Sequence, residues 1–438
     1  MSNVNNIYDV AGIGIGPFNL GLSCLLYEHK SLTKVFFDCK PSFDWHTGIM
    51  PEWVTLQIPF IADLVTFADP TNKFSILNYF KETGRLYQFY IHENFYLSRE
   101  EYNKYCQWVV NKQNVLNFNK RIESLYYNNT KQYYEIDVLN MNTNNIEKYN
   151  AKKLVIGTGT SPRKPSYFKD GQDGLYLSSE YMSIKEYIQN KSSITIVGSG
   201  QSGAEIFYDL LKDSCRYSYK LQWVGRPKNF FALDLNKLAL ELTSPDYKEF
   251  FSSLSPKVRK NLLQEQSSLY KGVNLLLLNR IYDYLYLHHD QCKDRVNIYP
   301  GLEVTNCIRC NEKWNIPVKS KLSQKDYSLN SEVIIFALGY QYVEPEFLRG
   351  VNDIINRDEY GNILVSDIYT IDSRDTIFVQ NVGLEQHGIV TPDLGMGPYR
   401  NSIIANNLLN VLFIYHPLTI LIVFLSRKIK VLMYIKLV

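Results

Sequence analysis

The stretch Val10-Ala-Gly-Ile-Gly-Ile-Gly-Pro-Phe-Asn-Leu-Gly-Leu22 places a glycine-dense turn between an apolar strand and a helix-compatible run. This arrangement lets backbone N–H groups and a helix N-terminus face a pyrophosphate, although glycine-rich turns also open many helices that bind nothing. A second apolar strand, Val35-Phe-Phe-Asp38, ends in an acid at the distance from the turn where a ribose-binding carboxylate belongs. Together the two strands predict a dinucleotide site made of Gly12, Gly14, Gly16, Pro17, Asn19 and Asp38.

A second glycine-rich stretch, Ser193-Ile-Thr-Ile-Val-Gly-Ser-Gly-Gln-Ser-Gly-Ala-Glu205, carries the complete Gly-x-Gly-x-x-Gly spacing between an apolar strand and a helix. Its partner strand begins at Leu221 and ends in Arg226 rather than in an acid. An arginine there accommodates the 2′-phosphate of NADP, so NADPH is favoured over NADH, with an unliganded surface arginine as the alternative. The residues predicted to bind NADPH are Gly198, Gly200, Gln201, Ser202, Gly203 and Arg226.

Length and composition are those of a globular protein of two or three domains, with 438 residues, 45% apolar and 21% charged. The formal net charge of +3 is small and gives no reason to expect nucleic-acid binding. Seven cysteines at irregular spacing argue against a disulfide framework and for a reducing compartment. Cys307-Ile-Arg-Cys310 has neither a second pair nor a nearby histidine, so no metal site is predicted. No secretion signal is visible, and we expect a cytoplasmic protein.

The order of elements predicts an α/β fold with two Rossmann-like dinucleotide-binding domains and a small helical substrate-binding insertion. Residues 74–111 read as helical, with a Ser98-Arg-Glu-Glu101 capping box, and residues 115–150 alternate as antiparallel strands do. The predicted division is a first domain over 1–185, a second over 186–330 with the helical insertion at about 235–291, the rest of the first over 331–414, and an apolar tail over 415–438.

The mainly apolar residues 411–425 are fewer than the ~20 that span a bilayer. Basic residues follow at Arg427, Lys428 and Lys430, which leaves surface association open, but we do not expect a membrane protein.

Two dinucleotide units in one chain predict two nucleotide cofactors whose reactive rings meet, most simply a flavin that takes hydride from a nicotinamide. The reduced flavin could then pass electrons to a disulfide, to a quinone or to O₂. A disulfide reductase needs a redox pair near the flavin, and Cys307 and Cys310 come after the second sheet has been built. Reaction with O₂ needs a dry pocket.

Motifs from residue 7 to residue 410 carry a further resemblance: Gly12-Ile-Gly-Ile-Gly-Pro-Phe-Asn-Leu20, Phe43-Asp-Trp-His46, Leu56-Gln57, Asp63-Leu-Val65, Asp69-Pro70, Asn78-Tyr79, Gly198-Ser-Gly-Gln-Ser-Gly-Ala-Glu205, Phe336-Ala-Leu-Gly-Tyr340 and His387-Gly388. In this order they resemble the microbial N-hydroxylating flavin monooxygenases, the lysine N6-/ornithine N5-monooxygenase family of hydroxamate siderophore biosynthesis. Asn19 takes the place of the usual third glycine, as in that family, whereas Leu338 stands where the family has Thr.

The resemblance implies that NADPH reduces FAD, that O₂ adds at the flavin C4a, and that the hydroperoxide oxygen passes to a neutral primary amine. An alkylamine with a pKa of about 10.4 must therefore lose a proton in a dehydrated pocket. By the same resemblance, Gln57 lies beside the flavin, Trp45 and His46 line its face, and the chain forms a homo-oligomer, usually a tetramer. His46 could instead be a structural histidine.

Three departures from the family bear on the substrate, because Ala62, Leu240 and Gly395 stand where amino-acid hydroxylases carry Lys, Asn and Ser. The resemblance implies that these positions touch the amino-acid head group, and a carboxylate buried there would lack a paired charge. We therefore expect a diamine such as putrescine or cadaverine, or histamine. Asp393 is a candidate partner for a second cationic group, with a helix N-cap as the alternative.

Two other substrates, lysine and ornithine, remain as alternatives within the family. A flavin-binding pathway protein that does not hydroxylate is the alternative from another class. A Baeyer–Villiger oxygenase is disfavoured by the Gly-Pro-x-Asn opening at Gly16 to Asn19.

Overall fold

The first glycine-rich stretch folds as predicted into strand, turn and helix. In the computed structural model, which describes residues 6–410, β1 (Ile7–Ile13) leads through the turn into α1 (Pro17–Leu25). Strands β2 (Lys34–Phe37) and β6 (Asn145–Ile156) both pair with β1 in parallel. Most of β1 is buried, as expected for a parallel strand covered on both faces.

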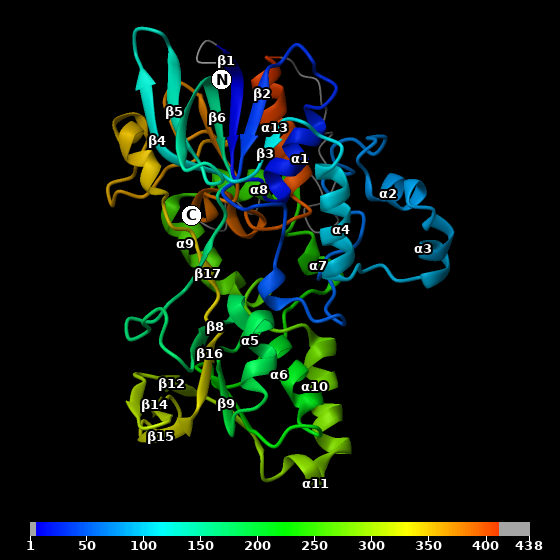
Figure 1. Ribbon diagram of the computed structural model, residues 1–438, viewed down its shortest axis with the longest axis vertical. Helices are drawn as coiled ribbons and strands as arrows, with labels where there is room; N and C mark the ends of the chain where they lie inside the picture. The colour runs from blue at the N-terminus through cyan, green and yellow to red at the C-terminus, as the bar shows by residue number, and fades with distance from the viewer. Residues whose placement is uncertain (1–5, 411–438) are drawn as a thin grey trace.

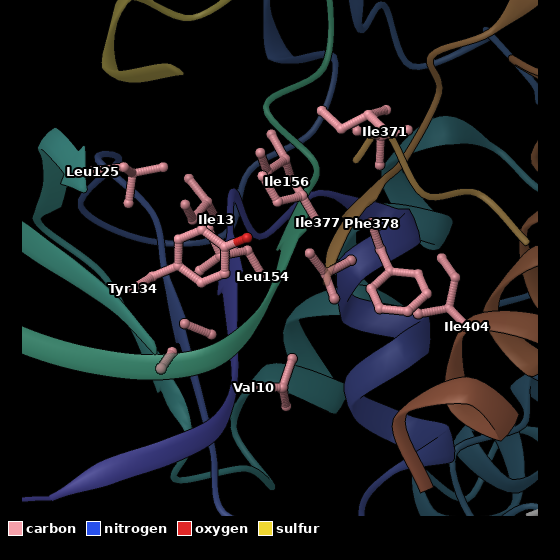
Figure 2. Packing of buried hydrophobic residues seen from close by; sticks show 14 of the residues in the cluster. Val10, Ile13, Leu125, Tyr134, Leu154, Ile156, Ile371, Ile377, Phe378 and Ile404 are labelled. Atoms are coloured by element: carbon pink, nitrogen blue, oxygen red, sulfur yellow. The ribbon is translucent and has the colours of Figure 1, made fainter. Parts of the chain in front are cut away.

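The first sheet has the strand order β3-β2-β1-β6-β5-β4, with β18 pairing to β6. Strands β4, β5 and β6 form the predicted antiparallel meander. Figure 2 shows the apolar core beside this sheet, where side chains from β1, β6 and β18 meet Ile404 of α13. The remaining bounds are β3 Leu116–Asn117, β4 Lys120–Asn128, β5 Tyr133–Asn140, β18 Ile377–Val379 and α13 Gly397–Leu409.

Three helices follow the long connection after β2, which confirms the helical prediction for residues 74–111. The Ser98 hydroxyl caps the third by accepting the N–H of Glu101 at 3.1 Å. Figure 1 shows these helices beside the first domain, with the second domain at the other end of the long axis. Their bounds are α2 Ile76–Glu82, α3 Leu86–His92 and α4 Arg99–Val110.

The second sheet is parallel throughout, with the order β11-β10-β9-β16-β8. Strand β9 leads through the second glycine turn into α6, as predicted. The predicted limits of this domain, 186 and 330, need correction, because β8 and β16 lie outside them and still pair in its sheet. The bounds are β8 Leu175–Leu177, β9 Ser193–Val197, α6 Gln201–Asp213, β10 Lys220–Gly225, β11 Val296–Pro300 and β16 Val333–Phe336.

The helices of residues 235–291 pack in two groups rather than as one insertion. Helices α8 and α9 pack near Ile389, Val390 and Met396, which follow β18, whereas α10 packs on α6 through Leu277 and Ile281. The helices are α7 Lys237–Leu240, α8 Pro245–Ser253, α9 Pro256–Glu265, the 3₁₀ helix η3 Gln266–Leu269, α10 Leu275–Leu287 and α11 His289–Cys292.

The other elements complete both domains. A small antiparallel sheet extends the second domain, and short segments connect it back to the first. They are η1 Thr47–Ile49, β7 Ser161–Pro162, η2 Ser178–Glu180, α5 Tyr181–Ile188, β12 Leu302–Val304, β13 Ile308–Cys310, β14 Lys313–Ser320, β15 Asp326–Ser331, β17 Tyr340–Gln341, η4 Glu346–Ile354, α12 Leu384–His387 and η5 Gly388–Val390.

The last described helix is α13, and the predicted tail over 415–438 lies outside the described residues. Within residues 6–410, no helix combines the length and the apolar character that crossing a bilayer requires.

Candidate functional site

The first glycine turn is a tight bend that opens onto free space. A Cβ on Gly12 would lie 2.0 Å from the Phe36 ring, and one on Gly14 would lie 2.4 Å from the carbonyl oxygen of Gly157, where φ is also +87°. A Cβ on Gly16 would meet no atom of the described residues within 4 Å. Gly16 caps α1 without any side-chain hydrogen bond from the described chain, and Pro17 follows it. The N–H groups of the first helical turn are therefore available to an anion.

Two polar side chains hold this turn in place. The Asn19 carboxamide donates to the carbonyl oxygens of Gly14 at 2.8 Å and of Val155 at 3.2 Å, which joins the ends of β1 and β6. The Asp38 carboxylate accepts the N–H of Ile15 at 2.7 Å. Each carboxylate oxygen has further lone pairs, so Asp38 can still accept a ribose hydroxyl. The predicted acid is thus at the strand end and also orders the turn.

The predicted flavin wall lies in the connection after β2. The Trp45 and His46 rings meet edge to face at 4.3 Å, and the Tyr340 ring lies 6.4 Å from His46. Loss of water around the imidazole, reinforced by the charges of Arg99 and Lys40, lowers the pKa of His46 to about 4, so the ring is neutral at neutral pH. The side-chain amide nitrogen of Gln57 is buried without a hydrogen-bond partner among residues 6–410. A buried donor of this kind costs stability unless a ligand accepts its bond.

The second glycine turn is closed by backbone contacts. Gly198 has φ +142°, and a Cβ there would lie 2.1 Å from the carbonyl oxygen of Ala337. A Cβ on Gly203 would lie 2.5 Å from the carbonyl oxygen of Gly198, so only glycine allows this approach of helix and strand. Gly200 caps α6 and, within the described chain, faces open space. Gln201 and Ser202 form the first turn of α6, where Gln201 also accepts the N–H of Asn274 at 2.8 Å.

Arg226 follows β10 directly, at the edge where the second turn lies. Its side chain is 74% exposed, and Glu303 is 3.9 Å away. Lys321 binds the same glutamate at 2.5 Å. The guanidinium is therefore able to move toward a phosphate, at a position that suits the 2′-phosphate of NADP.

Three of the four predicted substrate residues come together. A Cβ on Gly395 would lie 3.0 Å from Oδ1 of Asp393, 3.5 Å from Cβ of Ala62 and 3.7 Å from the Phe67 ring. Leu240 lies at the end of α7 with an exposed side chain and is not among these nearest neighbours. Phe67 was not predicted, because nothing in the sequence distinguishes it from a core aromatic residue.

Asp393 also accepts a hydrogen bond from the N–H of Met396 at 3.2 Å, just before α13. This bond closes a turn before the helix, since Met396 is the N-cap of α13 and, among the described residues, no side chain caps it. Burial raises the pKa of this carboxyl, while the N–H groups of Gly395 and Met396 and the charge of Arg400 oppose the rise. The buried Arg400 guanidinium donates to the carbonyl oxygen of Thr391 at 3.0 Å and stacks 4.4 Å from the Phe18 ring.

The cysteine pair singled out in the sequence lies at a short strand of the small antiparallel sheet. Cys307 and Cys310 are free thiols beside or within β13. Over the described part of the chain, residues 6–410, no group of three or more His, Cys, Asp or Glu side chains could hold a metal ion.

Comparison with known proteins gives a consistent result. A family model for L-lysine 6-monooxygenase/L-ornithine 5-monooxygenase matches residues 6–342. The chain is 44% identical over 407 residues to a putrescine N-hydroxylase of Acinetobacter baumannii, covering 93% of this chain and 91% of that protein. It is 44% identical over 405 residues to a putrescine N-hydroxylase of Shewanella oneidensis, and this match covers 92% of this chain and 81% of that protein.

Among solved structures, the crystal structure of DfoA bound to FAD, a desferrioxamine-pathway cadaverine monooxygenase of Erwinia amylovora, superposes with a TM-score of 0.91. The two sequences are 42% identical, and the match covers 94% of this chain and 97% of that one.

Proposed function

The chain belongs to the L-lysine 6-monooxygenase/L-ornithine 5-monooxygenase family, and from this premise we propose that it hydroxylates one amino group of a diamine. The enzyme is an NADPH-dependent flavin monooxygenase that uses FAD and O₂. Its product is a hydroxylamine for hydroxamate siderophore biosynthesis. The candidate substrates are the diamines putrescine and cadaverine, or histamine.

Both cofactors fit the residues present. The open N-terminus of α1 suits the FAD pyrophosphate, Asp38 suits its ribose, and the buried amide donor of Gln57 suits a flavin acceptor atom. The open N-terminus of α6 suits the NADPH pyrophosphate, and the exposed Arg226 suits its 2′-phosphate. When bound, FAD supplies the redox and oxygen chemistry that amino-acid side chains lack.

The observation that carries the substrate proposal is that Asp393 and Ala62 both lie next to Gly395, at 3.0 and 3.5 Å from the position of an added Cβ. At the place where the amino-acid hydroxylases are expected to offer a lysine to a carboxylate, this chain offers a carboxylate and two small side chains. An α-carboxylate near Asp393 would be repelled, whereas the second ammonium of a diamine would be attracted. The proposed difference in substrate therefore comes from an inversion of the protein's charge at this place, from a lysine to a carboxylate.

The two nitrogens of the diamine need opposite protonation. The reacting nitrogen must be neutral, because an ammonium has no lone pair, and a dehydrated site favours that form. The distant nitrogen stays charged against Asp393, whose carboxylate must be ionised. Because burial raises the pKa of Asp393, we expect diamine binding to weaken as the pH falls through that raised value.

Comparing putrescine with butylamine, which lacks the second nitrogen, tests this assignment. We expect Asp393→Asn to raise the KM for putrescine about tenfold, because the variant loses a charge-assisted bond to the second ammonium. The KM for butylamine, which has no second ammonium, should rise less than about twofold. Asp290→Asn is the matched control, because that side chain is 90% exposed and lies far from Asp393 in the sequence. Equal effects on both amines would mean that Asp393 only closes the turn before α13.

We also propose that the chain works as a cytoplasmic homo-oligomer, a tetramer by family resemblance. Light scattering on the purified enzyme measures this mass directly.

A further inference from the structure

The long aromatic connection after β2 has a part that cofactor binding does not explain. We call residues 45–57 the linking segment. Its first residue lies against α4, where the Asn103 side chain accepts the N–H of Trp45 at 3.1 Å. It ends beside α4 as well, because the N–H of Leu56 donates to the carbonyl oxygen of Leu97 at 2.8 Å. Both ends therefore belong to the first domain.

The middle of the linking segment is buried in the second domain. Ile49 is 2% exposed and belongs to the apolar core that contains the residues of β9 and α6. A Cβ on Gly48 would lie 1.7 Å from the carbonyl oxygen of Ser179, so the backbones of the two domains touch there. The linking segment thus leaves one domain, packs into the other and returns.

A buried carboxylate on α6 receives a donor from the linking segment. Oδ1 of Asp209 accepts the indole N–H of Trp53 at 3.0 Å. Its other oxygen, Oδ2, accepts the hydroxyl of Tyr181 and the ammonium of Lys185, both at 2.7 Å, and these two donors belong to α5 of the second domain. Trp53 is therefore the contribution that the linking segment makes to this carboxylate.

A second buried carboxylate lies one helical turn earlier. Glu205 accepts hydrogen bonds from both terminal guanidinium nitrogens of Arg99 on α4, at 2.8 and 2.9 Å. Arg99 also donates to the carbonyl oxygen of Ile49 at 3.1 Å, which ties the ion pair to the linking segment. The first domain thus supplies donors to two carboxylates of the same helix.

Residues four apart lie on one face of a helix, so Glu205 and Asp209 present a single face of α6 to the first domain. Both are buried, with 0% and 4% of their surfaces exposed. A buried carboxylate that loses a donor costs stability, so this face has one preferred orientation. The N-terminus of the same helix forms the second glycine turn.

We infer that Trp53 is a positioning residue, which fixes the orientation of α6. It thereby holds the second glycine turn at a set distance from Trp45 and His46, the predicted flavin wall. The inference rests on the proposed cofactors. The linking segment carries His46 and Gln57 on either side of Trp53, so one short stretch joins the flavin wall to the helix that starts the NADPH site. Hydride transfer depends steeply on such a distance, because reacting atoms must approach to about 3–3.5 Å.

The test is anaerobic reduction of the FAD-loaded enzyme by NADPH, followed by flavin absorbance. We expect Trp53→Phe, which keeps an aromatic ring but removes the indole N–H, to lower the limiting rate of reduction about tenfold. Because Trp53 is not part of the glycine turn, the Kd for NADPH should change less than about twofold. Reduction by dithionite, which needs no second domain, should proceed at the wild-type rate.

Tyr181→Phe is the matched control. It removes another donor to Asp209, but from α5 within the second domain. We expect its limiting rate to stay within about twofold of wild type. A wild-type rate in Trp53→Phe, or an equal loss in Tyr181→Phe, would overturn the positioning role and leave the proposed function standing. Failure of NADPH to reduce the wild-type flavin would overturn both.

Discussion

The two glycine-rich turns share a backbone plan, yet the protein holds them differently. The first is tied by side chains, with Asn19 joining two strand ends and Asp38 binding the N–H of Ile15. The second is tied by the buried Trp223, whose indole N–H donates to the carbonyl oxygen of Gly198 at 2.7 Å. The turns differ in their charged residues, because Asp38 is buried whereas Arg226 is 74% exposed. A buried acid suits a cofactor that stays, and an exposed cation suits one that exchanges. We therefore expect FAD to be retained through purification and NADPH to dissociate between turnovers.

The largest effect should come from Gly14→Ala in the first turn. Its φ of +87° and the carbonyl oxygen of Gly157, 2.4 Å from the added Cβ, leave an alanine no relaxed conformation. We expect the purified variant to retain less than about a tenth of the FAD of wild type, measured by absorbance after denaturation.

Gly84→Ala is the control, because Gly84 also has positive φ, +72°, but no atom of the described residues lies within 4 Å of its added Cβ. Full FAD content in Gly14→Ala would refute the tight first turn.

A smaller loss should follow from Asn19→Ala. The side chain is 1% exposed, and its removal leaves buried carbonyl oxygens of Gly14 and Val155 without this donor. We expect the free energy of unfolding in urea to fall by about 2–4 kcal/mol. Asn190→Ala removes a single exposed bond to Glu186 and should cost less than about 0.5 kcal/mol. Equal unfolding midpoints would show that the first turn does not depend on Asn19.

The smallest change should come from Arg226→Ala in the second turn. Because this side chain is exposed, the variant should unfold at the wild-type temperature. Loss of a charge-assisted phosphate bond should raise the KM for NADPH about tenfold, and the KM for NADH less than about twofold. Arg349→Ala, at another exposed arginine, controls for the loss of charge. Parallel changes for both nucleotides would remove the 2′-phosphate role of Arg226.

Much of the cofactor architecture could be predicted because its signals are local. Glycine spacing, a strand before each turn and the residue at the end of the next strand all lie within one short stretch of sequence. These signals located both turns, Asp38 and Arg226. The domain limits were less accurate, because a buried apolar strand such as Val333–Phe336 reads the same in either sheet, and the strand pairing places it in the second.

The contacts between domains could not be predicted in the same way. Trp53 and Asp209 are 156 residues apart, and Arg99 and Glu205 are 106 apart. Glu205 and Asp209 did give a signal, since two acids on one face of an otherwise apolar helix need partners. The sequence could not say which donors supply them. The resemblance implied one site for Ala62, Leu240 and Gly395, and the fold places Ala62 and Gly395 together beside Asp393, without Leu240 among the nearest neighbours of Gly395.

Product analysis under ¹⁸O₂ tests whether the enzyme hydroxylates a diamine. The FAD-loaded enzyme and NADPH are supplied in turn with putrescine, cadaverine, histamine, lysine and ornithine, and hydroxylamine products are weighed by mass spectrometry. We expect one ¹⁸O atom in the hydroxylated diamine and little product from either amino acid. Labelled N-hydroxylysine or N-hydroxyornithine without any hydroxylated diamine would contradict it, and so would peroxide as the sole product with every amine.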